Sequence, residues 1–276
     1  MAGATATRTS TIGYAGFGNA AAAVFSEEKF KVSAAFRNFS PDNLKEKFYS
    51  AGAAYKPTDK VVLGIGAVYG ANEKYDKYND MGVRYGTFRP EDMILSAGAA
   101  YRFAEYLSAG VNVRYVSSSI AEGHSYDATA FDAMVMTKFS PVARLTLKAA
   151  GGVRSVGSKV ESYDGSKVSL PSSAVVAVGA DYAPGKMHRV EAELDADCGF
   201  EDGTAFSAGA SYCYAGMASI RAGYRYGGDT VVPSHVSAGA GFRYAGVQID
   251  FAYLFPAGKN SSLLKKTFNL GLAWSF

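Results

Sequence analysis

From Phe30 onward the chain is a succession of short segments in which apolar residues alternate with polar or small ones. The last segment is the clearest, because Phe268, Leu270 and Leu272 fall on one face while Thr267 and Asn269 fall on the other. Alternation with a period of two is typical of a β-strand whose two faces meet different surroundings. Repeated along the whole chain, this pattern predicts an all-β protein.

Turn signals divide the chain into about fourteen such segments of roughly 10 to 15 residues each. We place the predicted strands at residues 29–39, 47–57, 60–72, 91–103, 106–120, 126–139, 144–160, 171–183, 188–200, 204–214, 217–227, 233–244, 247–256 and 265–276. An even number of strands joined in sequence order can close into an antiparallel barrel, which leaves no unpaired edge.

Composition narrows the class of barrel. The sequence has 31 Gly and 19 Tyr but 8 Pro and a single Trp, which suits many short strands. It contains no run approaching the roughly 20 apolar residues of a membrane helix, so a bilayer could be crossed only by a closed barrel. A mean hydropathy of −0.02 fits such a barrel, in which lipid-facing and lumen-facing residues cancel. We therefore predict a transmembrane antiparallel β-barrel.

The predicted connections alternate in length. Six of them are tight: Pro57-Thr58-Asp59, Ala104-Glu105, Ser140-Pro141-Val142, Pro184-Gly185-Lys186, Ala215-Gly216 and Ala245-Gly246. The intervening ones are mostly longer and more polar, notably Glu73 to Pro90, Glu161 to Leu170 and Ala257 to Leu264. Short turns at one end and longer loops at the other are the pattern of the bacterial outer membrane. We expect the short turns, and with them both termini, to face the periplasm.

The C-terminus carries a possible assembly signal. The chain ends in Phe276, with Trp274, Gly271 and Asn269 before it. This pattern resembles the C-terminal signal read by the barrel-assembly machinery, which we expect to be a partner during biogenesis, as we expect outer-membrane lipid and lipopolysaccharide to surround the finished barrel. An amphipathic strand could also end a soluble β-sandwich, which is the alternative.

An internal repeat marks the strands that run toward the periplasm. Segments such as Ser50-Ala-Gly-Ala-Ala-Tyr55 and Ser96-Ala-Gly-Ala-Ala-Tyr101 share one template, whose aromatic residue should point to lipid and whose glycine should point inward. The inward glycines form a predicted ring: Gly52, Gly98, Gly179, Gly209, Gly239 and Gly271. Glycine in a strand often marks a bend or the close approach of another backbone.

The small, Gly/Ala-rich residues 1–28 could fill the space that the inward glycines leave in the lumen. We therefore divide the chain into an N-terminal lumenal segment, 1–28, and a barrel, 29–276. We predict that part of Thr9 to Phe25 lies against the glycine ring and narrows the pore. The alternative is that the glycines only let the wall curve.

Charged residues are predicted at many lumen positions. The strongest feature is an acidic stripe on one strand, formed by Glu191, Glu193, Asp195 and Asp197. Basic residues predicted to face the same lumen include Lys148, Arg154, Arg221, Arg225 and Arg243. Either these charges line a pore or hold a basic ligand, or they brace the wall and hold the N-terminal segment by pairing. We favour the second interpretation.

Other classes of function find little support. A net charge of +3, without a basic cluster interleaved with aromatics, argues against nucleic acid as a partner. His124, His188 and His235 form no recognisable Ser/His/Asp grouping or spaced pair of metal ligands, so we predict no enzyme, metal or cofactor; an outer-membrane hydrolase would require His124 and His235 to meet an acid.

Four smaller expectations concern the cysteines, the N-terminus, the outer wall and one loop. Cys198 and Cys213 should lie too far apart for a disulfide, and the N-terminus lacks the pattern of a secretory signal, so we read the sequence as the mature chain. Alanines on the predicted outer wall suggest a lateral protein partner in the membrane: Ala51, Ala53, Ala97, Ala99, Ala208, Ala210, Ala238 and Ala240. The loop Glu73 to Pro90 is either a lid over the mouth or a docking surface.

The segment Ile12-Gly-Tyr-Ala-Gly-Phe-Gly-Asn-Ala-Ala-Ala-Ala-Val-Phe25 resembles the Gly-rich and Asn-Pro-Ala segment that opens members of the FadL-like superfamily, including its PorV/PorQ branch. The proline is absent here. The resemblance implies fourteen strands with an N-terminal segment in the lumen. It also implies either passage of small hydrophobic compounds across the outer membrane or an accessory subunit, without a conducting pore, of a protein-secretion or envelope-assembly machine.

Overall fold

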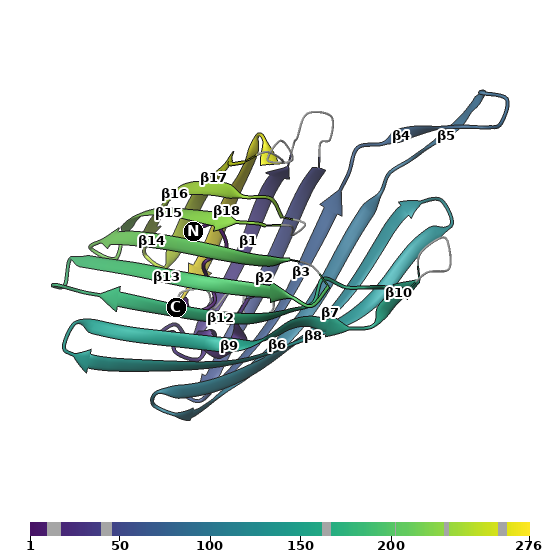
Figure 1. Ribbon diagram of the computed structural model, residues 1–276. Helices are drawn as coiled ribbons and strands as arrows, with labels where there is room; N and C mark the ends of the chain where they lie inside the picture. The colour runs from purple at the N-terminus through teal and green to yellow at the C-terminus, as the bar shows by residue number, and fades with distance from the viewer. Residues whose placement is uncertain (10–17, 40–45, 162–166, 202, 229–231, 259–263) are drawn as a thin grey trace.

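The computed structural model describes residues 1–9, 18–39, 46–161, 167–201, 203–228, 232–258 and 264–276. Its main body is a closed barrel of fourteen antiparallel strands, each paired with its neighbours in sequence and the first paired with the last (Figure 1). The barrel strands are β1 (Phe30–Phe39), β2 (Glu46–Thr58), β3 (Val61–Ala71), β6 (Glu91–Ala104), β7 (Leu107–Ala121), β8 (His124–Val142), β9 (Leu145–Gly157), β12 (Ser173–Tyr182), β13 (His188–Gly199), β14 (Thr204–Tyr214), β15 (Ala218–Tyr226), β16 (His235–Tyr244), β17 (Val247–Pro256) and β18 (Thr267–Ser275). The predicted fold class and strand number are confirmed.

Four short strands lie outside the barrel sheet. β4 (Tyr75–Tyr78) pairs with β5 (Arg84–Phe88), and β10 (Lys159–Glu161) pairs with β11 (Lys167–Ser169). The β4–β5 hairpin projects away from the barrel as an extension of its wall, so it does not lie across the mouth as a lid (Figure 1). The hydroxyl of Tyr75 donates to the carbonyl of Ile120 at 3.1 Å, and Lys77 forms an ion pair with Glu122. The hairpin therefore contacts the end of β7 and its connection to β8.

The tight connections at Pro184-Gly185-Lys186, Ala215-Gly216 and Ala245-Gly246 occur where the sequence predicts them. The other three lie further along the chain than predicted, because β2 continues to Thr58, β6 to Ala104 and β8 to Val142, so that the predicted turn Ser140-Pro141-Val142 is part of a strand. In the loops Ala215-Gly216 and Ala245-Gly246 both residues have positive φ, from 49° to 82°. Two-residue hairpin loops require this geometry because it matches the twist of the flanking strands. We refer to the end of the barrel with these loops as the short-turn end and to the opposite end as the long-loop end.

The two faces of the wall differ as the alternation predicts. Outward positions are aliphatic or aromatic and exposed, and inward positions are small, polar or charged and mostly covered. Five of the six template aromatics, Tyr55, Tyr101, Tyr182, Phe242 and Trp274, are exposed on the outside near the short-turn end, in agreement with their predicted direction, and the sixth, Tyr212, is partly covered. An exterior of this kind is stable only when lipid covers it.

Two further predictions can be compared with the structure. Both cysteines are free, since Cys198 pairs with Thr204 and Cys213 with Arg189, at opposite ends of one hairpin. Among the described residues, no helix is long and apolar enough to cross a bilayer.

Candidate functional site

The first residues of the chain lie inside the barrel, where the acidic stripe holds them. The backbone N–H groups of Thr5 and Ala6 donate to the Asp195 carboxylate at 3.0 and 3.1 Å. The N–H of Thr7 donates to Glu193, and the guanidinium of Arg8 lies 3.6 Å from the carboxylate of Glu191. Three carboxylates spaced two residues apart on β13 thus face donors of the four successive residues Thr5 to Arg8, which are backbone N–H groups in the first three and the guanidinium in Arg8. This geometry corresponds to the interpretation in which the stripe holds the N-terminal segment.

Side chains of Met1 to Arg8 are small enough to fit there. Ala4, Ala6 and Thr7 have no exposed surface. Of the predicted glycine ring, two members contact this part: a Cβ on Gly179 would lie 2.4 Å from the hydroxyl of Thr7, and one on Gly209 would lie 2.7 Å from the Cβ of Met1. Among the described residues, these two contacts with the ring are made by Thr7 and Met1, which precede the predicted stretch Thr9 to Phe25. Residues 10–17 of that stretch lie outside the described residues.

The remaining ring glycines have other surroundings. A Cβ on Gly239 would lie 2.7 Å from the carbonyl oxygen of Phe251 in the neighbouring strand, which fits the curvature interpretation at that position. Gly52, Gly98 and Gly271 occupy inward positions of β2, β6 and β18.

A second part of the N-terminal segment packs against β7, which lies four strands away from β13 around the barrel. Asn19 caps the four-residue helix α1 (Ala20–Ala23), accepting from the N–H of Ala21 at 3.0 Å and donating to the carbonyl of Ala6 at 2.7 Å. The hydroxyl of Ser108 donates to the carbonyl of Ala21 at 2.8 Å. The side-chain amide of Asn112 donates to the carbonyl of Gly18 at 2.9 Å. Both partners lie on β7, so the segment reaches from β13 to β7.

Glycine makes this second contact possible. A Cβ on Gly110 would lie 2.6 Å from the backbone nitrogen of Ala21, closer than side chains tolerate. Beyond α1, Val24 packs with Ala54, Val62 and Ala100. Phe25 packs with Met134, Met136 and Ala150, and the ammonium group of Lys138 lies 4.6 Å from the centre of its ring.

The segment joins the wall at the short-turn end. Glu28 forms ion pairs with Lys31 at 3.5 Å and Arg243 at 2.7 Å, and the ammonium group of Lys56 donates to the carbonyl of Ser26 at 2.8 Å. The backbone N–H groups of Lys29 and Phe30 then donate to the carbonyl of Phe276, each at 3.0 Å.

The described residues of the N-terminal segment contribute to the lining of two cavities. The one toward the long-loop end has about 590 Å³, and Met1, Ala2 and Gly3 form part of its lining. The surface of its other walls is mainly apolar, although about as many polar as apolar residues line it: Phe39, Phe48, Val232, Ala252, Leu254, Leu264, Arg37, Glu46, Arg225, His235, Ser237, Thr267 and Asn269. Such a lining, with a mainly apolar surface and polar groups between, resembles the usual composition of a small-molecule site.

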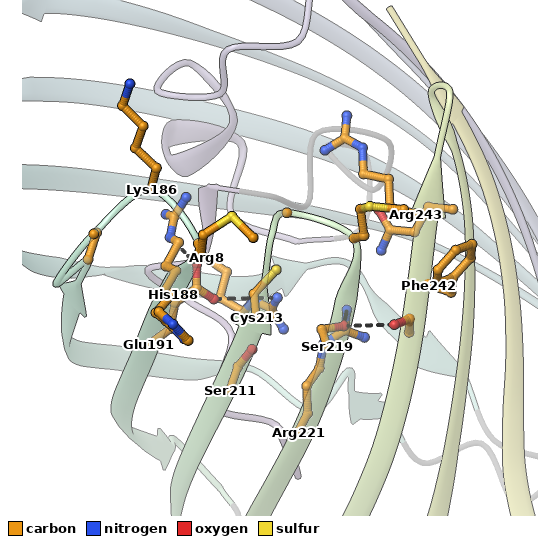
Figure 2. A pocket seen from close by; sticks show the side chains of 18 residues that line it. Arg8, Lys186, His188, Glu191, Ser211, Cys213, Ser219, Arg221, Phe242 and Arg243 are labelled. Carbon is orange, nitrogen blue, oxygen red and sulfur yellow. Dashed lines mark hydrogen bonds and ion pairs between the residues drawn. The ribbon is translucent and has the colours of Figure 1, made fainter.

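The cavity toward the short-turn end has about 460 Å³ and is strongly basic (Figure 2). Arg8 reaches it from the N-terminal segment, and Lys186, Arg189, Arg221 and Arg243 reach it from the wall. Figure 2 shows Arg8 directed toward Glu191 and Arg221 toward Ser219.

Most of the predicted basic lumen residues contact acids or hydroxyls. Lys148 pairs with Asp181 at 2.7 Å and Arg221 with Asp250 at 2.6 Å, while Arg225 donates to Ser207 at 3.3 Å. Arg154 lies near enough for its charge to act on Asp195, and Asp197 acts in the same way on Arg225. Because of this pairing, the lumen charges are largely compensated within the wall and the segment.

Sequence reasoning missed the buried acid Asp132 and the residues that it contacts. Asp132 is 3% exposed, pairs with Arg114 and accepts from the backbone N–H of Ser155 at 2.8 Å. It sits at a register shift between β8 and β9, where Ser155 has a φ of 55°. The alternation along β8 places Asp132 on the same face as Met134 and Met136, and this pattern could have identified it as an inward acid. Gly110 and Gly223, which contact the N-terminal segment, were missed as well.

The histidines and acids offer no grouping for catalysis in the part of the chain that the structure describes. His188 contacts the hydroxyl of Tyr212 at 2.7 Å, and His235 contacts the carbonyl of Pro233 at 2.9 Å. Within the same residues there is no cluster of three His, Cys, Asp or Glu side chains that could hold a metal ion.

No family model matches the chain, and no curated protein matches it in sequence. Its fold, however, is similar to several solved structures. The toluene transporter TodX of Pseudomonas putida has a TM-score of 0.59 at 12% identity, over 95% of this chain and 93% of that one. The monoaromatic hydrocarbon channel CymD has a TM-score of 0.60 at 13% identity, over 96% and 93% of the two chains.

A FadL homologue of Pseudomonas aeruginosa has a TM-score of 0.56 at 12% identity, and the match covers 100% of this chain and 98% of that one. At such low identity these similarities show the fold alone. The chain therefore shares the closed antiparallel β-barrel fold of these three proteins.

Proposed function

We propose that this protein lets small hydrophobic molecules enter and cross the outer membrane. The observation that carries the proposal is the cavity of about 590 Å³ toward the long-loop end, whose walls are largely apolar and whose lining includes the N-terminal segment. Two of the solved structures with this fold are named as a toluene transporter and a monoaromatic hydrocarbon channel. A ligand of that size and polarity would fit between Phe39, Phe48 and Leu254.

In this proposal residues 1–28 act as an internal gate. Met1 to Gly3 line the first cavity and Arg8 lines the second, and the described part of the segment is held by discrete contacts to β13 and β7. A ligand that displaces Met1 to Gly3 would reach the second cavity and leave at the short-turn end. The division of the chain into a segment, 1–28, and a barrel, 29–276, therefore has a functional meaning.

We also infer the orientation of the barrel. The short-turn end faces the periplasm, as short turns do in outer-membrane barrels. Asn269, Gly271, Trp274 and Phe276 serve the assembly machinery before the barrel closes. Asn269 has a second role in the finished barrel, where its side-chain oxygen accepts a hydrogen bond from Arg37 at 2.7 Å.

The accessory-subunit alternative and the PorV/PorQ branch have no specific observation in their favour. The three similar structures are named as a transporter, a channel and a FadL homologue, so we do not carry that alternative further.

A single cavity position tests the transport proposal. Leu254→Asp places a carboxylate in the apolar wall, whereas Leu254→Met keeps the wall apolar and serves as the matched control. Because burying a leucine side chain contributes about 1.5–3 kcal/mol, we expect uptake of labelled toluene at low concentration to fall roughly tenfold or more in Leu254→Asp. Equal uptake by the two variants, or uptake no faster than in cells lacking the protein, would overturn the proposal.

A further inference from the structure

The outer wall carries an aromatic patch on four adjacent strands, β2, β1, β18 and β17. Its members face outward near the long-loop end: Tyr49, Phe36, Phe268, Phe251, Tyr253 and Phe255. The ring centre of Phe36 lies 5.4 Å from that of Tyr49 and 6.0 Å from that of Phe268. The ring centres of Phe268 and Phe251 lie 6.2 Å apart. The rings form one continuous surface that crosses the junction between the first and the last strand.

Lysines lie beside this patch at the long-loop end. A hollow of about 490 Å³ in the outer wall is lined by Phe251, Tyr253, Phe255 and Pro256 together with Lys265 and Lys266. Lys47 faces outward on β2 opposite Asn38, whose side chain donates to the carbonyl of Lys266 at 3.1 Å. Three ammonium groups therefore share the stretch of rim next to the aromatic surface.

The rim on β6 and β8 carries outward carboxylates. There Asp127 faces outward and its carboxylate contacts the hydroxyl of Tyr115 at 2.7 Å. Glu91 stands beside Tyr69 on the same side of the barrel. A ligand with anionic groups at the level of the rim would be attracted to the lysines and repelled by these carboxylates.

We propose that the aromatic patch and its lysines bind an outer-leaflet glycolipid of the lipid A class, which carries phosphate groups on its headgroup and several acyl chains. The acyl chains lie over the exposed rings, and the phosphates lie between Lys265, Lys266 and Lys47. Lysine binds phosphate as a compact, mobile point charge, which suits a lipid headgroup at a membrane surface. The proposal rests on the inferred orientation, in which the long-loop end faces the outer leaflet, and is independent of transport.

The test uses the intact protein in detergent, titrated with bisphosphorylated hexa-acyl lipid A and monitored by native mass spectrometry. Lys265→Gln/Lys266→Gln removes two charges at the hollow. Lys74→Gln/Lys159→Gln removes two exposed lysines at the same end but outside the patch and is the matched control. Since each lysine near an anionic lipid surface changes binding by roughly fivefold, we expect the first variant to bind at least about tenfold more weakly and the control to bind like the wild type.

Two further arms identify the ligand. Lipid A without its phosphates, and phosphatidylglycerol, should both bind the wild type much more weakly than the bisphosphorylated form. Any of three results would overturn the proposal. These are an equal loss of lipid A binding in the two lysine variants, binding of dephosphorylated lipid A or phosphatidylglycerol as tight as that of the bisphosphorylated form, and a second copy of the chain covering the patch. Toluene uptake by Lys265→Gln/Lys266→Gln should stay at the wild-type level, so that a failure of the lipid site and a failure of the transport proposal are told apart.

Discussion

The two parts of the N-terminal segment are held inside the barrel by different physics. Met1 to Arg8 is held at β13 by carboxylates that accept from successive backbone N–H groups. Asn19 to Phe25 is held by a buried alanine helix that fits against Gly110, supported by Ser108 and Asn112. The first kind of contact depends on charge and the second on shape. A gate anchored in both ways can release one side while the other stays in place.

Removing both parts should have the largest effect. Deletion of residues 2–24 leaves the wall intact but joins the two cavities, so we expect single-channel conductance in planar bilayers to rise several-fold. The truncated barrel should still migrate as a heat-modifiable folded species on gels. If truncated and intact proteins conduct alike, the segment does not close the lumen.

Breaking the charge-based anchor should have an intermediate effect. In Glu193→Ala/Asp195→Ala, the amides of Thr5, Ala6 and Thr7 lose hydrogen bonds to charged acceptors, each worth about 1.5–3 kcal/mol. We expect these amides to exchange with deuterium roughly 10 to 100 times faster, while the amides of α1 keep their rates. Asp197→Ala is the control, because among the described residues Asp197 has no hydrogen bond or ion pair to the segment. Unchanged exchange in the double variant would show that the stripe does not hold this part.

Breaking the shape-based anchor should have the smallest effect. Gly110→Ala brings a methyl group within 2.6 Å of the Ala21 nitrogen, and such overpacking costs about 1–3 kcal/mol. We expect the amides of Ala21 to Ala23 to exchange faster with deuterium, whereas the amides of Thr5 to Thr7 keep their wild-type exchange rates. Gly151→Ala is the matched control, since its new Cβ would lie 3.6 Å from the nearest atom, an ordinary contact. Equal effects of the two alanines would mean that α1 does not depend on the fit at Gly110.

Much of the barrel could be predicted because its signals are local and repeated. A period of two assigns each residue of a strand to a face, and turn residues such as Ala215-Gly216 mark where the strands reverse. The inward direction of Glu193 and the outward direction of Tyr101 follow from the same counting. The sequence also placed the acids of β13 and residues 1–28 in one lumen.

The contacts inside the lumen could not be predicted to the residue. The N-terminal segment has no periodic pattern, so nothing in the sequence sets which of its residues faces which glycine, and Met1 and Thr7 were not expected at Gly209 and Gly179. The cluster around Asp132 depends on a register shift that alternation cannot reveal. The aromatic patch was missed because it combines strands from the two ends of the chain.

The junction of β1 with β18 also governs how the molecule can be assembled. The N–H groups of Lys29 and Phe30 donate to the carbonyl of Phe276 and β1 pairs with β18, so the ring of strands can close only after β18 has been synthesised. Pairing between opposite ends of a chain is the slowest kind of contact to form in folding. Glu28, one residue before this junction, already contacts Arg243 of β16. We therefore expect the segment to be enclosed during ring closure rather than threaded into a finished barrel, which makes sealing the wall and filling the lumen a single late step of folding.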